Sequence, residues 1–464
     1  MMIHWFRQDL RLQDNPAFNY AASQEKVFPI YIFNPDPKNI RAMGAASQCW
    51  LHDSLENLNH SLNGKLSCYR GDPEVILSTL IKKHQITGIV WNRCYEPENI
   101  QQDKAIQAFS EAANIEIKSF NGALLWEPGE IVKTDGEFYK VFTPFYQASL
   151  TSTRRPRIPL NRPSKVDCFH DSESLKIADL ELLPKIPWHQ KIKKYWEMSE
   201  KKAHEILAHF LKTGIQNYQE GRNFPAQAHV SHLSPYLHFG QISPNQIWYA
   251  LRSKEKNDDI DFFGRELIWR EFAYHLLYQH PDLSKKNLQS KFDRFPWQNN
   301  LEKLKAWQKG ETGYPIVDAG MRELWETGYM HNRVRMIVAS FLVKNLLIDW
   351  RLGEEWFWEC LVDADLANNA MNWQWVAGCG ADAAPYFRIF NPITQAQKFD
   401  PEGEYIRRFI PELKNLPNNY LFDPAKAPPI VLANAKVIIG ENYPKPIVDL
   451  ARSRREALEI FSAL

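Results

Sequence analysis

The spacing of apolar residues changes once along this chain, and that change limits the folds it can adopt. In the first 120 residues, short runs of β-branched and aromatic residues alternate with stretches of helical spacing. The runs predict strands at residues 3–6, 27–33, 66–69, 89–92 and 115–120. Asn15-Pro16 and Asp72-Pro73 each pair an N-cap residue with a first-turn proline, which predicts the start of a helix. This alternation predicts an α/β domain with a parallel, Rossmann-like sheet and right-handed crossovers.

A different pattern fills the rest of the chain. From about residue 124 to 187 the sequence is rich in Pro, Ser and isolated charges, and residues 154–165 contain five basic residues and no acidic one. Such a run is typical of a solvated linker, with phosphate binding as the alternative. Helices are predicted at residues 201–212, 260–279, 301–309, 320–327, 332–348 and 354–362. We therefore predict an α/β domain at 1–125, a linker at 126–190 and an all-α domain at 191–464.

Composition and local sequence exclude several classes of protein. Lys and Arg total 56 against 55 Asp and Glu, so a polyanion would have to bind a local basic patch. The six cysteines form no C-x-x-C pair, which argues against a zinc ribbon, an iron–sulfur cluster or a disulfide framework, and no metal site is predicted. Arg7 and Asp9 stand where a signal peptide would be apolar, and Lys344 and Asp349 interrupt the longest apolar run. We expect a protein of the reducing cytoplasm with no membrane contact.

Residues 363–375 carry the strongest functional signal. They place two carboxylates, a run of amides and two indoles in about three and a half helical turns. Burying an unpaired amide costs roughly 1–3 kcal/mol and a charge costs more, so such groups are buried where a polar partner satisfies them. A planar cofactor that forms hydrogen bonds is the partner this mixture favours. No G-x-G-x-x-G follows the first strand, so we expect the main cofactor outside the sheet domain.

Two predicted helical faces and one loop mix groups suited to chemistry. In the predicted helix 260–279, Glu266, Trp269 and Arg270 have i, i+3 and i+4 spacing, so a carboxyl, an indole and a guanidinium share a face. The simpler interpretation is an exposed Glu–Arg pair beside a core Trp. A second face carries an amide, a cation and a thioether, at Asn332, Arg335 and Met336. The loop 218–234 offers hydroxyls and backbone amides that suit a phosphate, which is a weak signal by itself.

Seven motifs stand in a fixed order along the chain. They are WFRQDLRLQDN at 5–15, LSPYL at 233–237, WREF at 269–272, GYPIVD at 313–318, MHNRVRM at 330–336, DAD at 363–365 and YFRIFNP at 386–392. In these motifs and their order, the chain resembles the photolyase/cryptochrome family. It is most similar to the bacterial class I enzymes of that family, which repair cyclobutane pyrimidine dimers in DNA. The resemblance covers nearly the whole chain.

The resemblance implies that FAD lies folded in the helical domain. The phosphates and ribityl chain would contact Tyr218, Val230, Ser231, His232, Leu233 and Ser234. Asp363, Ala364 and Asp365 would line the isoalloxazine and adenine, and Asn369 would face flavin N5. Arg335 would pair with Asp363 near the ring, which keeps a buried charge compensated.

The resemblance also implies light-driven repair of UV-damaged DNA, in which an electron passes from photoexcited reduced FAD to a flipped-out dimer and returns after the ring opens. Glu266 and Asn369 would be the catalytic residues. The lesion pocket would hold Glu266, Trp269, Asn332, Met336 and Trp375, and the DNA backbone would meet Arg222, Arg270, Arg333 and Arg388. Trp373, Trp350 and Trp297 would be the proximal, middle and distal members of a chain that carries electrons to oxidised flavin.

The sequence departs from the family pattern at a few positions. Val230 and His232 stand where class I enzymes more often carry Thr and Arg, which puts FAD affinity in doubt, and Phe263 replaces a common indole. Near Glu98 and Asn99 the acid and the amide are exchanged relative to the folate-binding pattern. These two residues are the candidates for holding a second, light-harvesting chromophore. The identity of this chromophore stays open: it could be methenyltetrahydrofolate, a deazaflavin or FMN, or there could be none.

The alternatives are a cryptochrome-type blue-light sensor without repair activity and an enzyme that repairs 6–4 photoproducts. Asn369, where a sensor would carry Asp or Cys, the intact lesion pocket and the absence of a long tail favour dimer repair over sensing. A 6–4 enzyme would have a His pair where Asn332 and Met336 stand. We expect UV-damaged DNA as the partner of a monomer with no obligate protein partner.

Overall fold

The computed structural model describes residues 1–24, 26–35, 41–112, 115–383 and 388–464, without the side chains of 111–112. The chain forms two compact units. Unit 1 comprises residues 1–213 and 231–281, and unit 2 comprises residues 214–230 and 282–464. Each unit is described by itself. The sequence predicts folding domains at residues 1–125 and 191–464 with a linker between them. The two compact units do not test those boundaries, which stay a prediction.

Unit 1 contains the predicted parallel sheet. Its strands are β1 (Met2–Phe6), β2 (Val27–Phe33), β3 (Ser67–Arg70), β4 (Gly88–Asn92) and β5 (Glu116–Phe120), in the order β3-β2-β1-β4-β5. Every neighbouring pair is parallel, and Ile3 of β1 is in register with Phe28 of β2 and Ile89 of β4. The order reverses between β1 and β4, as in a doubly wound fold. The predicted fold class and strands are confirmed, with strand ends within about one residue.

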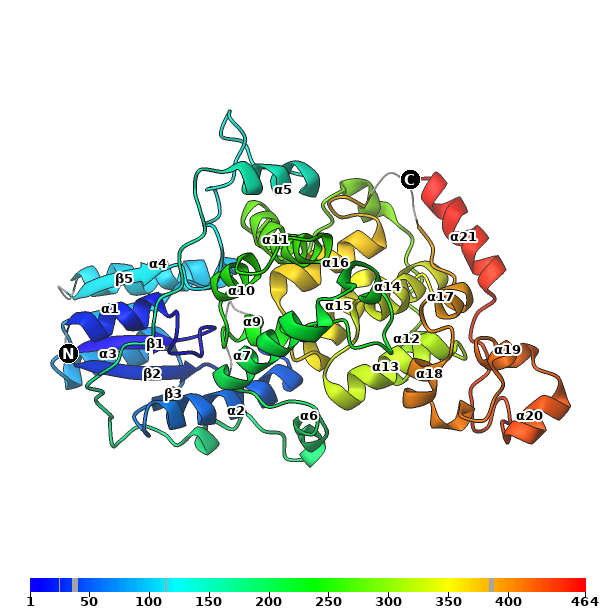
Figure 1. Cartoon of the computed structure of the whole chain (residues 1–464), viewed down its shortest axis with the longest axis horizontal. Coiled ribbons are helices and arrows are strands. Elements are labelled where there is room, and N and C mark those ends of the chain that lie inside the picture. The colour runs from blue at the N-terminus through cyan, green and yellow to red at the C-terminus, as the bar shows by residue number, and fades with distance from the viewer. Residues whose placement is uncertain (25, 36–40, 113–114, 384–387) are drawn as a thin grey trace. The chain divides into compact units, whose positions relative to one another are not determined.

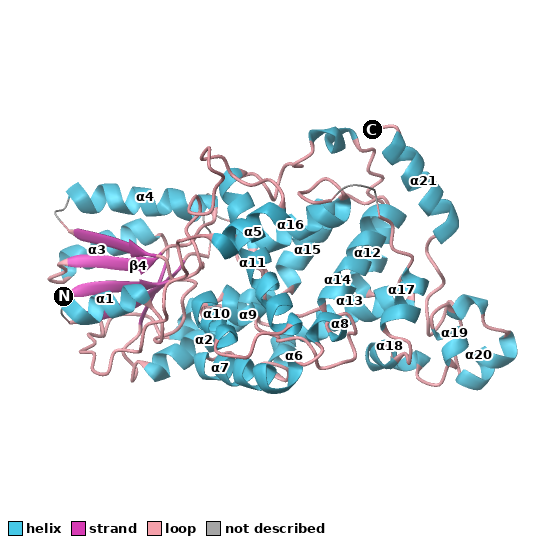
Figure 2. Cartoon of the chain, turned by 45° about the horizontal axis from the view of Figure 1, so that its top comes forward, coloured by secondary structure: helices cyan, strands magenta, loops and turns pink. Residues whose placement is uncertain are grey.

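Helices cover both faces of this sheet (Figures 1 and 2). The helices of unit 1 are α1 (Pro16–Gln24), α2 (Ala45–Ser61), α3 (Pro73–Lys83), α4 (Pro97–Ala112), α5 (Phe142–Thr151), α6 (Gln190–Lys193), α7 (Glu200–His209), α9 (Ser234–His238), α10 (Pro244–Arg252) and α11 (Asp258–Gln279). Leu77 and Leu80 of α3 and Ile106 of α4 belong to one buried cluster with the strands. The predicted caps form: Asn15 Oδ1 accepts from the amide of Phe18, and Asp72 accepts from the first turn of α3.

The basic run at 154–165 follows an extended path along unit 1, and three of its arginine side chains bond to that unit. The Arg157 guanidinium lies 2.5 Å from Asp14 Oδ1, and Arg162 donates to the carbonyl of Ser61 at 2.8 Å. Arg154 pairs with Glu130 at 2.7 Å. The linker is thus tied to the sheet unit by its own cations, rather than being wholly solvated.

Unit 2 is helical. Its helices are α8 (Tyr218–Gly221), α12 (Leu301–Lys309), α13 (Pro315–Thr327), α14 (Asn332–Ser340), α15 (Trp350–Cys360), α16 (Leu366–Ala377), α17 (Pro392–Phe399), α18 (Glu404–Phe409), α19 (Asn418–Leu421), α20 (Pro429–Ala435) and α21 (Leu450–Ser462). Its core is aromatic, with the side chains of Trp307 and Trp350 fully buried. The predicted helix 332–348 is shorter than expected, because α14 widens into a π-helical turn at Phe341–Asn345.

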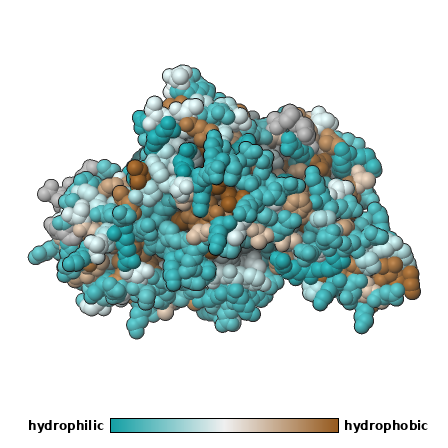
Figure 3. Space-filling view, viewed as in Figure 1, coloured by the Kyte–Doolittle hydropathy of each residue, from teal (hydrophilic) through white to brown (hydrophobic). Residues whose placement is uncertain are grey.

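The surface in Figure 3 is mostly hydrophilic, with apolar side chains in small areas. Within the described part of the chain, no helix combines the length and the apolar character needed to cross a bilayer.

Candidate functional site

The predicted site residues are distributed over both units. Unit 1 contains Ser231, His232, Leu233, Ser234, Glu266, Trp269 and Arg270, together with the antenna candidates Glu98 and Asn99. Unit 2 contains Tyr218, Arg222, Val230, Trp297, Asn332, Arg333, Arg335, Met336, Trp350, Asp363, Ala364, Asp365, Asn369, Trp373, Trp375 and Arg388. The structure brings several of these together within each unit.

A buried ion pair in unit 2 joins Arg335 of α14 to Asp363. Nη2 of Arg335 lies 3.0 and 2.8 Å from the two carboxylate oxygens, and its Nε donates to the carbonyl of Met330 at 2.7 Å. The Asp363 side chain is only 4% exposed. Burial alone would lower the pKa of Arg335, but the adjacent Asp363 carboxylate raises it overall. The pair that the resemblance implies is present, and each charge compensates the other.

The start of α16 is fixed by Asp365. Its Oδ1 accepts from the backbone N–H of Asn368 at 2.8 Å and from the Asn368 amide at 2.7 Å, so this carboxylate is the N-cap of the helix. One turn later, the buried Asn369 donates from Nδ2 to the carbonyl of Glu354 at 3.1 Å and to its Oε1 at 2.8 Å. Both N–H groups of the Asn369 amide are therefore engaged by Glu354, and its Oδ1 is left to accept from a ligand.

This donor and acceptor set fits a flavin. The isoalloxazine is planar and carries both N–H donors and acceptor atoms. Unit 2 offers an acceptor at Asn369 Oδ1, and separately a paired guanidinium and carboxylate at Arg335 and Asp363. Among the described residues, the buried Nε1 of Trp373 on α16 also has no hydrogen-bond partner. Within the same described part of the chain, no three His, Cys, Asp or Glu side chains gather in a way that could hold a metal.

Two guanidinium groups lie close together in unit 2. Arg333 donates to the side-chain oxygen of Asn223 and to Sδ of Met336 at 3.8 Å, and its guanidinium lies 4.4 Å from the Phe399 ring centroid. Burial and the neighbouring charge of Arg222 lower the pKa of Arg333. Two like charges this close favour an anion between or above them, which suits the predicted contact with a DNA phosphate. Asn332, also predicted here, is exposed in the first turn of α14.

The three predicted electron-transfer tryptophans surround the start of α15. The Trp373 ring lies against the backbone of α15 at Gly353, three residues after Trp350, and contacts Phe357 with ring centroids 4.9 Å apart. Trp297 is half-buried and packs on Phe295 at 4.2 Å. The residues that follow Trp297 bond to those that precede Trp350: Gln298 donates to the carbonyl of Leu347 at 2.8 Å, and Asn299 accepts from the amide of Asp349 at 2.8 Å.

Replacement of Gly353 by alanine tests this packing. A Cβ there would lie 2.2 Å from Trp373 Cη2 and 2.6 Å from Leu342 Cδ2, so we expect Gly353→Ala to lower the free energy of unfolding by about 1–3 kcal/mol in urea titrations. Gly264→Ala in α11 is the matched control, because a Cβ there meets no described atom within 4 Å. It should be neutral or stabilise by up to about 1 kcal/mol. A Gly353→Ala protein as stable as the control would contradict the close approach of Trp373.

Trp375 and Arg388 line a small cavity of about 20 Å³ in unit 2 together with Lys344. Lys344, in the π-helical turn, donates to the backbone carbonyl of Arg388, whose side chain is exposed. Burial, with the charge of Arg388 second, lowers the pKa of Lys344 to about 7. The first two residues of the motif at 386–392, Tyr386 and Phe387, lie outside the described residues.

In unit 1, the face predicted on α11 forms. Trp269 is half-buried and stacks on Phe142 of α5 with ring centroids 3.5 Å apart and planes 8° apart, and Glu266 lies one turn earlier, also half-buried. Arg270 donates to the carbonyl of Ala123 at 2.9 Å and lies 3.3 Å from Glu271. The Arg270 side chain is only 12% exposed, so most of its surface is already covered by contacts within the protein. Its predicted role at the DNA backbone stays a prediction.

The predicted phosphate loop ends in the short helix α9. His232 is exposed in the left-handed region at φ 53°, and the amide of Leu233 donates to Ser231 Oγ at 3.4 Å. Tyr218 begins α8 and is buried, and the guanidinium of Arg222 lies 5.5 Å from its ring centroid. The phosphate and ribityl roles of this loop stay predictions.

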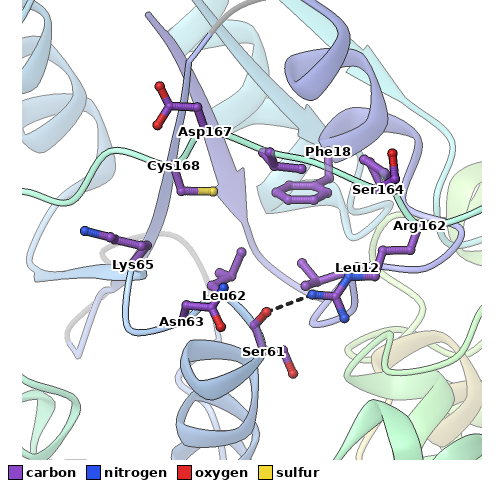
Figure 4. Close-up of a pocket in the computed structure, with 12 residues that line it drawn as sticks. Leu12, Phe18, Ser61, Leu62, Asn63, Lys65, Arg162, Ser164, Asp167 and Cys168 are labelled. Atoms are coloured by element: carbon purple, nitrogen blue, oxygen red, sulfur yellow. Dashed lines mark hydrogen bonds between the residues drawn. The ribbon is translucent and has the colours of Figure 1, made fainter.

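The antenna candidates lie in the first turn of α4. Asn99 donates to Glu96 Oε2 at 3.0 Å, and Glu96 Oε1 accepts from Gln8, so the buried carboxylate of this segment is Glu96 rather than Glu98. A separate hollow of about 520 Å³ in unit 1 is lined by Lys65, Arg162 and Asp167 among others (Figure 4). Glu98 and Asn99 do not line it. Their role with a second chromophore stays a prediction.

Three residues of these groups were not predicted. Glu354 orients Asn369 from 15 residues away, Asn223 holds Arg333 from 110 residues away, and Asn287 accepts from Trp350 from 63 residues away. No short-range spacing in the sequence marks such pairs. The one signal that could have identified Glu354 is its place on a helical face whose other members, Gly353 and Phe357 among them, are apolar.

The chain matches two family models. Residues 2–164 match the model described as DNA photolyase, and residues 262–463 match the one described as FAD binding domain of DNA photolyase.

Relatives with known names match over the full length. A deoxyribodipyrimidine photo-lyase of Agrobacterium fabrum is 45% identical over all of this chain and 98% of its own length. Cryptochrome-2 of Arabidopsis thaliana is 35% identical over 97% of this chain and 77% of its own length. The crystal structure of a bacterial class III photolyase from Agrobacterium tumefaciens superposes with a TM-score of 0.95 at 45% identity, covering 100% of this chain and 97% of that one. Since this neighbour is a class III enzyme, the class I assignment stays a prediction.

Proposed function

Because the chain belongs to the photolyase/cryptochrome family, we propose that it repairs cyclobutane pyrimidine dimers in UV-damaged DNA with the energy of blue light. It carries the FAD-binding domain of that family at residues 262–463. The observation that carries the proposal is the Asn369 amide, whose N–H groups are held by Glu354 so that its oxygen is the atom offered to the flavin. We further propose that the protein acts as a monomer in the cytoplasm.

Bound FAD in its reduced state supplies an electron to the dimer on illumination and takes it back after the cyclobutane ring has opened. The protein residues bind and orient. Arg335 and Asp363 form a neutral pair beside the flavin, so neither leaves an uncompensated charge near it. Glu354 fixes the orientation of the Asn369 amide, so that Asn369 Oδ1 would be free to accept a hydrogen bond from the reduced flavin.

The dimer has to leave the duplex to come close to the flavin, and a lesion that already stacks poorly is cheap to extrude. In unit 1, Trp269 has one ring face left to stack on a thymine, because its other face is covered by Phe142. In unit 2, Trp375 would offer an indole for the same purpose. Glu266 donates from its carboxyl to the thymine carbonyl on which negative charge grows as the electron arrives. Arg222, Arg333 and Arg388 bind the DNA backbone.

The alternative is a blue-light sensor without repair. The relative at 45% identity, matched over 98% of its length, is named as a photo-lyase, whereas the Arabidopsis cryptochrome is matched over 77% of its length at 35%. These likenesses favour repair.

Glu266→Ala tests the proposal directly. We expect its repair quantum yield, measured as dimers removed from oligothymidine per photon absorbed, to fall about tenfold, because a hydrogen bond to a charged group is worth roughly 1.5–3 kcal/mol. Glu266→Gln retains a donor of the same length and should keep most of the yield. Substrate affinity should change less than yield in both. Equal yields in wild type, Glu266→Ala and Glu266→Gln would show that no donor at residue 266 takes part in repair.

A further inference from the structure

The three electron-transfer tryptophans of unit 2 differ in what surrounds the indole N–H. Nε1 of Trp373 is buried and has no hydrogen-bond partner among the described residues. Nε1 of Trp350 donates to Asn287 Oδ1 at 2.9 Å, although the Trp350 side chain is itself 0% exposed. Trp297 is half-buried. The N–H groups of the two buried indoles therefore differ: that of Trp373 has no partner among the described residues, and that of Trp350 has an amide oxygen.

The acceptor of Trp350 is itself polarised by a carboxylate. Nδ2 of Asn287 donates to Asp293 Oδ1 at 2.7 Å, so a continuous series of hydrogen bonds runs from the buried indole through the amide to a negative charge at the surface. Hydrogen bonds in series strengthen one another, since each donor becomes more acidic and each acceptor more basic. The Asn287 oxygen is thus a better acceptor than an isolated amide.

Other charges around this series largely cancel. The guanidinium of Arg351 lies 4.8 Å from the Trp350 ring centroid, which opposes positive charge on the indole, but Arg351 is paired with Asp349 at 3.0 Å. Lys286 is paired with Asp282 at 2.8 Å on the same exposed segment. The side chain of Lys285 is exposed, so solvent screens its charge, and its backbone carbonyl accepts from Arg351 Nε at 2.7 Å.

We propose that Asn287 and Asp293 are positioning residues that make Trp350 easier to oxidise than Trp373 and so give direction to electron flow along the tryptophan chain. This rests on the proposed function, because it requires a flavin beside Trp373. A hydrogen bond from an indole N–H to a polarised oxygen stabilises the indole radical cation more than the neutral indole, whereas the partnerless N–H of Trp373 receives no such stabilisation.

Bound FAD, oxidised and photoexcited, would supply the oxidant, and Trp373 would give up an electron to it and become a radical cation. An electron from Trp350 restores Trp373, and one from Trp297 restores Trp350. A thiol in solution finally reduces the Trp297 radical. The amide oxygen of Asn287 is too weak a base to remove the indole proton, so the Trp350 radical keeps it and passes the positive charge on, rather than trapping it by deprotonation.

Transient absorption of the FAD-loaded, oxidised protein in the presence of a thiol tests this. In Asn287→Leu, Trp350 loses its acceptor, so we expect the fraction of positive charge that reaches Trp297 to fall about tenfold and the Trp373 radical to recombine with the flavin. Asp293→Asn keeps an acceptor for Asn287 but removes the charge, and we expect a loss of about threefold. Glu302→Gln removes an exposed carboxylate of α12 that, in the described part of the chain, no contact joins to Asn287 or its neighbours, and it should behave as wild type.

Two controls separate this inference from the proposed function. Trp350→Phe should block formation of the Trp297 radical, and ultraviolet resonance Raman difference spectra between wild type and Trp350→Phe should show a hydrogen-bonded indole that Asn287→Leu shifts. If Trp350→Phe blocks the chain while Asn287→Leu and Asp293→Asn match wild type, the inference is overturned and the proposed function stands. If Trp350→Phe does not block the chain, both the route and the inference fail.

Discussion

Replacement of Trp373 by phenylalanine is expected to stop photoreduction of oxidised FAD while leaving repair by chemically reduced protein close to wild type. Trp373 lies one turn after Asn369 on α16, and its ring packs on α15 at Gly353, so we propose that it is the first electron donor to the flavin. Phenylalanine fills most of the same space but is far harder to oxidise. Loss of the indole therefore removes the path without removing the cofactor site.

The measurement is the absorbance of oxidised flavin during blue illumination with a thiol, followed by a repair assay after dithionite reduction. Trp358→Phe is the matched control, since Trp358 is a half-buried indole on the same α15 outside the chain, and its photoreduction should be unchanged. Wild-type photoreduction in Trp373→Phe would mean that electrons enter by another route. Loss of repair in the reduced variant would instead place Trp373 in the repair step.

The second large effect is expected at the buried ion pair. Arg335→Met leaves the Asp363 carboxylate, 4% exposed, without its cation, and breaking such a pair costs about 3–5 kcal/mol of folding free energy. We expect a corresponding shift in urea unfolding followed by circular dichroism, and a lower FAD content in the purified protein.

The double variant Arg335→Met/Asp363→Leu distinguishes stability from function. Apolar residues of similar size often replace a buried ion pair without loss of stability, so the double variant should recover most of the folding free energy. Its FAD content should stay low, because the polar groups beside the flavin are still missing. An Arg335→Met protein with wild-type stability and full FAD content would contradict a structural or binding role for the pair.

The sheet could be predicted closely from the sequence. Each strand is a short apolar run bounded by a turn or cap residue, and such local signals determine β1 to β5 and the starts of α1 and α3. Helix ends were less predictable. α13 begins at Pro315 rather than at residue 320, because proline is favoured in the first turn, where its missing N–H costs nothing. The π-helical turn at Phe341–Asn345 keeps an apolar pattern, so it reads as a continuing helix.

The functional side chains of the candidate site could be predicted from the sequence, but the residues that orient them could not. Motifs identified Arg335, Asp363 and Asn369, and the structure shows the first two paired. The partner of Asn369 is Glu354, on another helix, and the partner of Trp350 is Asn287, in a segment between helices. Long-range partners of this kind depend on how helices pack, which periodicity does not encode. The residues that orient the functional side chains were missed for this reason.

Light-driven repair can be measured with the purified protein. Purified protein with reduced FAD is mixed with dimer-containing oligothymidine and illuminated with blue light while thymine absorbance is followed. We expect thymine absorbance to recover in the light and not in the dark, and we expect a slower recovery with Asn369→Ala. Unchanged absorbance with FAD-loaded, reduced wild-type protein would contradict repair and favour a sensor.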